Sequence, residues 1–78
     1  MERYLNKDGS SGVEEFEIST DAIELIFEDR KFLYTYNQIR PGKSYVEEMK
    51  KKAVDGEGLN TYVNQYIRKN FYSKRPLN

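Results

Sequence analysis

Two residue types that carry much of protein chemistry are missing from this chain: none of its 78 residues is a cysteine or a histidine. Without cysteine the protein can form neither a disulfide nor a thiolate metal site, and this composition fits a reducing compartment such as the cytoplasm. Without histidine it lacks the commonest general base and the commonest metal ligand. We therefore expect no cofactor, no bound metal and no enzymatic activity.

Long hydrophobic runs are missing as well. No stretch reaches the length of about 18 apolar residues that a membrane-spanning helix needs. The first residues, Met1-Glu2-Arg3-Tyr4, lack the charged-then-apolar pattern of a secretory signal peptide. We expect a cytoplasmic protein that does not enter a membrane. A chain of 78 residues forms one domain at most, and its core is small.

Charge of both signs is abundant but unevenly placed. Residues 1–39 contain four basic and nine acidic residues, whereas residues 40–78 contain nine basic and four acidic ones, so the halves carry −5 and +5. No acidic residue follows Gly58. In the first half, glutamates such as Glu15, Glu17 and Glu24 fall in alternating patterns, which are typical of the solvated face of a sheet rather than of catalysis. The basic half could attract phosphate groups, or the two halves could simply neutralise each other.

Alternating apolar and polar residues predict three β-strands, at residues 13–19, 22–28 and 32–37. The turns between them are short, so we expect an antiparallel meander. Val13 is out of phase with Phe16 and Ile18, which indicates a bulge or the start of the strand. The preceding residues 1–12 are polar and are predicted to be a flexible N-terminal lead-in, although Tyr4 and Leu5 could dock. Residues 13–75 then form the single domain.

Helical periodicity follows the strands. Residues 43–54 carry one apolar stripe, and residues 59–70 carry a second, stronger stripe on one face. Pro76 keeps the tail after Phe71 from being helical. The predicted fold class is α+β: a three-stranded antiparallel β-meander followed by two α-helices packed on one face of the sheet. The predicted core residues are Phe16, Ile18, Ile23, Leu25, Phe27, Phe32, Val46, Met49, Val63, Tyr66 and Ile67.

The aromatic pair Tyr34 and Tyr36 lies on the third predicted strand. Residues two apart on a strand share a face, so the two phenol rings stand side by side. They either pack in the core, with their hydroxyl groups at a polar edge, or form a platform on which nucleic-acid bases stack. Phe32 shares their face and is predicted to be core, which favours the core interpretation.

The acid-free C-terminal stretch contains the best candidate binding surface. Basic residues interleaved with an aromatic residue suit a sugar-phosphate backbone and an occasional stacked base. The competing interpretation is a solvated helix end whose cations complement the helix dipole. The candidate nucleic-acid-binding residues are Asn64, Gln65, Arg68, Lys69, Tyr72, Lys74 and Arg75.

Five stretches of the chain share a pattern with a known family. They are Ser10-Ser11-Gly12-Val13 with Phe16 and Ile18; Leu25-Ile26-Phe27 with Phe32-Leu33-Tyr34-Thr35-Tyr36; Pro41, Tyr45 and Met49; Ala53; and Tyr62-Val63-Asn64-Gln65-Tyr66-Ile67-Arg68 with Phe71. In this order, over residues 10–75, they resemble the KTSC domain, a short module named for the C-terminal end of some lysyl-tRNA synthetases and also found as small stand-alone bacterial proteins. The connection at residues 55–59 is longer than the family's. The resemblance implies a domain without an established activity, for which RNA binding has been suggested.

These observations lead to two functional hypotheses. The first is a small non-catalytic binding module of the KTSC type, with RNA as its candidate ligand. The alternative is a protein-interaction or homodimerisation module without a nucleic-acid role, because a small sheet leaves edges that can accept a strand. The sheet face that carries Ile26 and Leu33 could also pair with a second copy.

Overall fold

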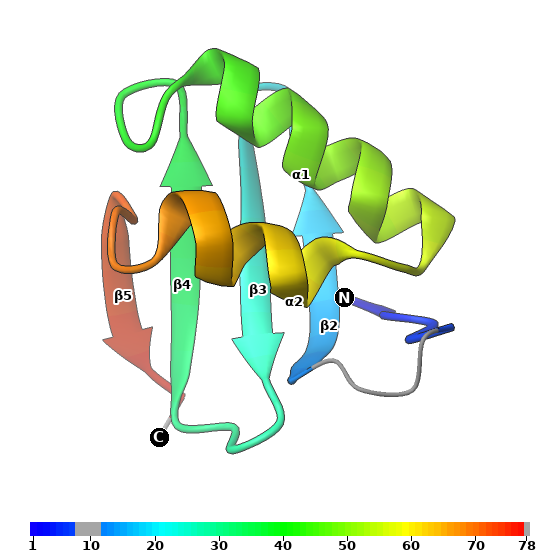
Figure 1. The fold of residues 1–78 in the computed structure, drawn as a ribbon. Helices are drawn as coiled ribbons and strands as arrows, with labels where there is room; N and C mark the ends of the chain where they lie inside the picture. The colour runs from blue at the N-terminus through cyan, green and yellow to red at the C-terminus, as the bar shows by residue number, and fades with distance from the viewer. Residues whose placement is uncertain (8–11, 78) are drawn as a thin grey trace.

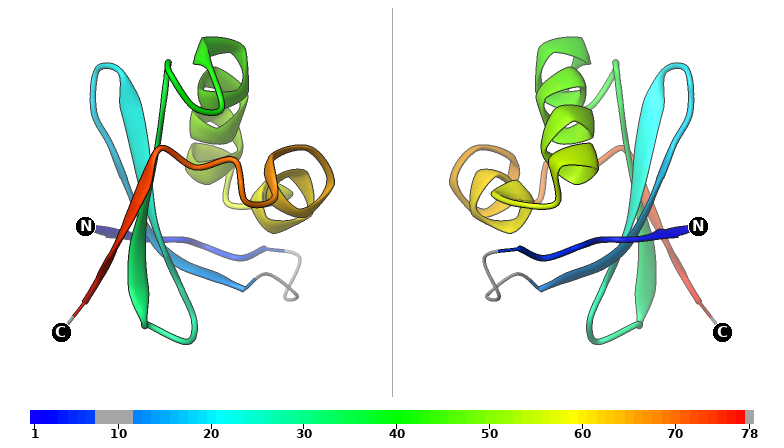
Figure 2. Two further views of the ribbon diagram at one scale, coloured as in Figure 1. Left: turned by 90° about the vertical axis from the view of Figure 1, so that its left-hand side faces the viewer. Right: turned by 90° about the vertical axis from the view of Figure 1, so that its right-hand side faces the viewer.

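One antiparallel sheet organises the computed structural model, which describes residues 1–7 and 12–77. Its strands lie in the sheet in their order along the chain: β1 (Glu2–Arg3), β2 (Val13–Ile18), β3 (Ala22–Phe27), β4 (Phe32–Asn37) and β5 (Ser73–Pro76). Between β4 and β5 the chain forms α1 (Lys43–Asp55) and α2 (Leu59–Tyr62), and α2 continues into the π-helical turn η1 (Val63–Ile67). Figures 1 and 2 show both helices on one face of the sheet.

The three central strands form the predicted meander, so this part of the fold class is confirmed. The predicted irregularity at Val13 is a β-bulge: Val13 pairs with Phe27 and Glu15 pairs with Ile26, which leaves Glu14 as the extra residue. The bulge brings Val13 onto the helix-facing side of the sheet, where it is buried with Phe16.

The N-terminal segment differs from the predicted lead-in. Glu2 and Arg3 form β1 and pair with Phe16 and Glu15 of β2. Tyr4 is only 3% exposed and belongs to the hydrophobic core, and the backbone N–H of Lys7 donates to the carbonyl oxygen of Gly56 at 2.7 Å. Two charged residues carry no apolar alternation, so the sequence offers no strand signal here. Residues 8–11 of the predicted lead-in lie outside the described part of the chain.

The C-terminal segment also departs from the prediction, because the helices do not end the fold. After η1 the chain returns to the sheet as β5, whose residues Ser73 and Pro76 pair with Thr35 and Phe32 of β4. Pro76 is compatible with this place because β5 is the outermost strand, where a missing backbone donor costs no hydrogen bond within the sheet. The sheet therefore has five strands among the described residues, rather than three.

The second predicted helix is shorter than expected and changes its winding. It is α-helical only from Leu59 to Tyr62, and in η1 the N–H of Arg68 donates to the carbonyl oxygen of Val63, five residues back, at 2.6 Å. A π-helical turn is wider than an α-helical one, so the residues within it point in directions that differ from those in a continuous α-helix. Ile67 stays buried, but Tyr66 is 61% exposed, which corrects its predicted place in the core.

Most other predicted core residues lie on the helix-facing side of the sheet or on the helices. Phe27 and Phe32 are only partly buried, and Ile18 is 40% exposed near the end of β2, where the prediction of a core position is wrong. The buried core cluster contains Tyr4, Val13, Phe16, Ile23, Leu25, Tyr36, Val46, Met49, Ala53, Leu59, Val63 and Ile67.

The open face of the sheet carries a second pair of buried residues. Ile26 and Leu33 lie opposite each other on β3 and β4, and they are 4% and 5% exposed. Glu15 and Arg75 lie beside them on the neighbouring strands. The apolar surface on which the homodimer hypothesis depends is therefore largely covered within one chain.

Candidate functional site

A groove of about 270 Å³ lies between η1 and the sheet. Figure 1 shows η1, the orange continuation of α2, crossing β4 next to β5. We call this groove the basic–aromatic groove. The residues that line it are Phe27, Tyr34, Tyr36, Val63, Asn64, Arg68, Lys69, Phe71 and Lys74.

The aromatic side of the groove is an interlocked cluster around Tyr34. The ring of Tyr34 stands edge-on to Phe27 and Phe71, with ring centres 5.3 and 5.1 Å apart. Such edge-to-face pairs contribute about 0.5–1.5 kcal/mol beyond the area that they bury. They hold the partly exposed Tyr34 ring in the wall of the groove.

Tyr36 has a different place from Tyr34, although both lie on the same face of β4. It is 1% exposed and belongs to the core, and its ring centre is 6.4 Å from that of Phe71. Burial raises the pKa of the Tyr36 hydroxyl group above its usual range, and the neighbouring Tyr34 adds to this effect. Of the two interpretations left open by the sequence, the core interpretation holds for Tyr36, whereas Tyr34 bridges the core and the groove.

The basic side of the groove is formed by Arg68, Lys69 and Lys74. Among the residues that the structure describes, none of these three forms an ion pair, and no carboxylate lines the groove. By contrast, Arg30, Lys50 and Lys52 each pair with a glutamate, at 2.8 Å for Arg30 to Glu15 and at 3.4 and 3.2 Å for the two lysines. The three cations of the groove are thus free to attract an anionic ligand.

Lys74 is positioned by an aromatic ring. Its ammonium nitrogen lies 4.5 Å from the centre of the Phe32 ring, which is within the range of a cation–π interaction. Lys74 lies opposite Tyr34 in the β4–β5 register, so its side chain is on the helix-facing side of the sheet. The pairing of β5 with β4 is what brings this C-terminal lysine to the aromatic cluster.

Arg68 occupies a strained position in the turn that ends η1. The N–H of Asn70 donates to the carbonyl oxygen of Ile67 at 2.9 Å, which closes a turn with Arg68 at its second position. The backbone angles of Arg68 are φ 52° and ψ −117°, a conformation that glycine adopts easily and other residues avoid. Strain of this kind concentrates at functional sites, as do π-helical turns.

Three of the candidate residues lie outside the groove. Gln65 is exposed on η1, and Tyr72 is exposed just before β5. Arg75 lies opposite Leu33, on the face of the sheet that the helices leave open. The structure thus brings together Asn64, Arg68, Lys69 and Lys74 with Tyr34 and Tyr36.

The sequence interpretation missed the part that Phe27 and Phe71 play in the groove. Phe27 was predicted only as a core residue, and Phe71 was named only as part of the KTSC-like pattern. Lys74 joins these two rings in the groove because β5 returns to the sheet beside β4. The only sequence signal near β5 was Pro76, which ends the helical pattern but does not indicate where the chain goes next.

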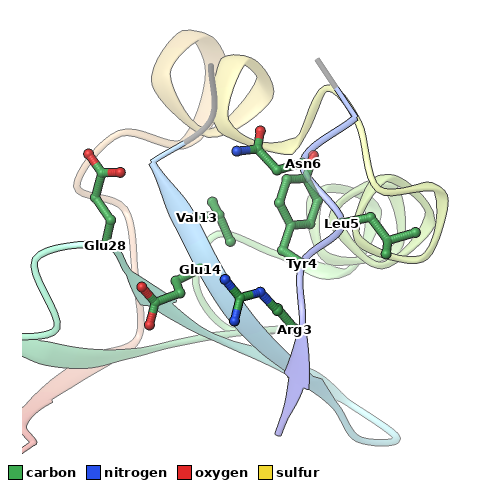
Figure 3. A pocket seen from close by; sticks show the side chains of 7 residues that line it. All are labelled: Arg3, Tyr4, Leu5, Asn6, Val13, Glu14 and Glu28. Carbon is green, nitrogen blue, oxygen red and sulfur yellow. The ribbon is translucent and has the colours of Figure 1, made fainter. Parts of the chain in front are cut away.

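A second hollow lies near the N-terminus, lined by Arg3, Tyr4, Leu5, Asn6, Val13, Glu14 and Glu28. Figure 3 shows Arg3 and Glu28 on opposite sides of it. Glu14 already pairs with Arg30, and Tyr4 is part of the core. Within residues 1–7 and 12–77 no group of three or more acidic side chains is arranged to hold a metal ion. The side chains around this hollow thus carry charges of both signs and do not favour a ligand of either sign.

No protein-family model, curated protein or solved structure matches this chain. The similarity to the KTSC domain stays a prediction that rests on the residues named for it above. In the described part of the chain, no helix combines the length and the apolar character that crossing a membrane requires.

Proposed function

We propose that the protein is a non-catalytic binding module whose basic–aromatic groove binds single-stranded RNA. The observation that carries this proposal is the convergence of three unpaired cations, Arg68, Lys69 and Lys74, on a partly exposed aromatic cluster in one groove. Proteins that bind single strands combine these two features, since cations follow the phosphates and aromatic rings stack with the bases.

Each part of the groove has a role in this proposal. Arg68, Lys69 and Lys74 contact phosphate oxygens, and Tyr34 with Phe71 offers aromatic surface to a base. The side-chain amide of Asn64 has both a donor and acceptors, so it can bind the edge of an unpaired base. Single-stranded RNA fits better than a duplex because its bases are free to reach the rings.

The conformation of Arg68 supports the same function. Glycine would relieve the strain at φ 52°, so an arginine at this position indicates a use for its side chain. The planar guanidinium group binds phosphate through two parallel hydrogen bonds.

The proposal is tested by measuring how binding of a labelled single-stranded RNA pool depends on salt, by fluorescence anisotropy between about 50 and about 200 mM salt. We expect Lys69→Gln and Lys74→Gln to weaken binding. Each should also reduce the steepness of log K against log salt by about 0.7, the contribution of one phosphate contact on a single strand.

The matched control is Lys51→Gln, which removes the same charge from the exposed side of α1, outside the groove. It should leave both the affinity and the salt dependence close to those of the parent protein. Equal effects of Lys51→Gln and Lys69→Gln would mean that RNA binds through overall charge and that the groove is not the site.

The alternative hypothesis, a protein-interaction or homodimerisation module, gains less support from the structure. Ile26 and Leu33 are buried within one chain, and the outer strand β5 carries Lys74, Arg75 and Pro76, which discourage pairing with another strand. A protein that shows no RNA binding at low salt but self-associates in sedimentation experiments would favour this alternative.

A further inference from the structure

The π-helical turn places an aromatic ring on the surface next to the groove. An uninterrupted α-helix would direct Tyr66 toward the core, together with Tyr62, Val63 and Ile67. In the structure Tyr66 is 61% exposed, and its ring centre lies 5.1 Å from that of Tyr62 with the planes tilted by 42°. Tyr62 thus fixes the Tyr66 ring from one side, and the rest of the ring is open to solvent.

The surroundings of Tyr62 show on which side of η1 this ring pair lies. The ammonium nitrogen of Lys52 is 5.4 Å from the centre of the Tyr62 ring, so the pair borders α1. Burial raises the pKa of Tyr62, and the nearby Glu48, Tyr45 and Tyr66 raise it further. The Tyr62–Tyr66 pair therefore faces the valley between α1 and η1, on the other flank of η1 from the basic–aromatic groove.

An exposed ridge, formed by η1 and the turn that follows it, separates the groove from this ring pair. Gln65 lies on η1 and Lys69 in the turn after it; both are exposed, and Lys69 also lines the groove. A helix with its side chains is only about 10–12 Å wide, so an extended strand could cross the ridge within a few nucleotides. Lys69 offers a free cation at the crossing, and Gln65 offers an amide.

We propose, building on the RNA-binding function proposed above, that Tyr66 is a second base-stacking position, reached by a single strand that leaves the groove over Lys69 and Gln65. A nucleic acid fits this surface better than a peptide for two reasons. The surface is continuous with unpaired cations, and the acidic Glu48 near the ring pair is neutralised by Lys52 at 3.2 Å. The RNA site is then longer than the groove.

The test compares two lengths of labelled single-stranded RNA on the parent protein and on Tyr66→Ala, using RNAs of about 4 and about 12 nucleotides. We expect Tyr66→Ala to weaken binding of the longer RNA by at least about fivefold, the effect of losing one base–aromatic stack. The shorter RNA, which fills only the groove, should bind as before. The salt dependence should not change, because no charge is removed.

Two further variants keep the test specific. Tyr66→Phe retains the ring and should bind the longer RNA like the parent protein. Val54→Ala removes an equally exposed apolar side chain, 65% exposed near the end of α1, and should have no effect. Thermal unfolding of each variant checks that the fold is retained.

The outcomes separate the two proposals. If Lys69→Gln weakens binding and Tyr66→Ala does not, the groove binds RNA and the second stacking position is wrong. If Tyr66→Ala weakens both RNA lengths equally, Tyr66 acts through the groove and the extended site is also wrong. If the parent protein binds neither RNA at low salt, both proposals fail, and a protein ligand becomes the hypothesis for the tyrosine pair.

Discussion

The hydroxyl group of Tyr4 accepts a hydrogen bond from the backbone N–H of Leu59 inside the core, with 3.2 Å between nitrogen and oxygen. Leu59 is the first residue of α2, and the first N–H groups of a helix have no partner within the helix. A residue from the N-terminal segment thus satisfies a donor that the fold buries far along the chain.

We expect Tyr4→Phe to lower the free energy of unfolding by about 1–3 kcal/mol, because it leaves the buried N–H of Leu59 without its hydroxyl acceptor. Urea unfolding followed by circular dichroism measures this change. Tyr66→Phe removes a hydroxyl group at an exposed position and should change the stability by less than about 0.5 kcal/mol. Equal stabilities of Tyr4→Phe and the parent protein would contradict the role assigned to this hydrogen bond.

At the scale of elements, the sequence predicts what alternation and helical periodicity can encode. β2, β3 and β4 are six residues each and carry clear alternation, so their meander was predictable. β1 is two charged residues and β5 is Ser-Lys-Arg-Pro, and neither has an apolar face. Both segments form strands because they pair with a neighbouring strand. Their own residues give no sign that a strand forms there. The π-helical turn changes the direction of the side chains without changing the apolar pattern, so that pattern predicts the same side of the helix for Tyr66 and Ile67.

The π-helical turn can be tested by truncating these two neighbours. Ile67→Ala should cost about 2–5 kcal/mol of unfolding free energy, because Ile67 is buried in the core. Tyr66→Ala should cost less than about 0.5 kcal/mol, because most of its ring is in solvent. A continuous α-helix would bury both side chains, so similar large losses would show that the turn is not π-helical.

The turn that ends η1 links stability to binding. We expect Arg68→Gly to raise the free energy of unfolding by about 1 kcal/mol, because glycine relieves the strain at φ 52°. The same substitution should weaken RNA binding, because it removes a cation from the groove. Chemical denaturation and anisotropy measure the two effects on one variant. A loss of both stability and binding would mean that the arginine supports the fold instead of serving the ligand.

At the scale of the whole molecule, the charge separation in the sequence becomes a spatial feature. The acidic first half supplies β1 to β4, and the basic second half supplies the helices and β5, with no acidic residue after Gly58. The residue types of the groove were therefore predictable from the interleaved basic and aromatic residues. The sequence did not predict that these residues lie beside Tyr34 and Phe27, because that arrangement depends on the return of the chain to pair with β4 as strand β5.

The measurement that tests the central claim most directly is an amide-shift NMR titration with a mixed single-stranded RNA pool, at low and at physiological salt. We predict salt-sensitive shifts clustered on the groove residues Asn64, Arg68, Lys69 and Lys74, weaker at the higher salt because ions screen the attraction. An absence of shifts at low salt, where attraction between charges is strongest, or shifts confined to the acidic strands, would contradict the assignment of the groove as an RNA site.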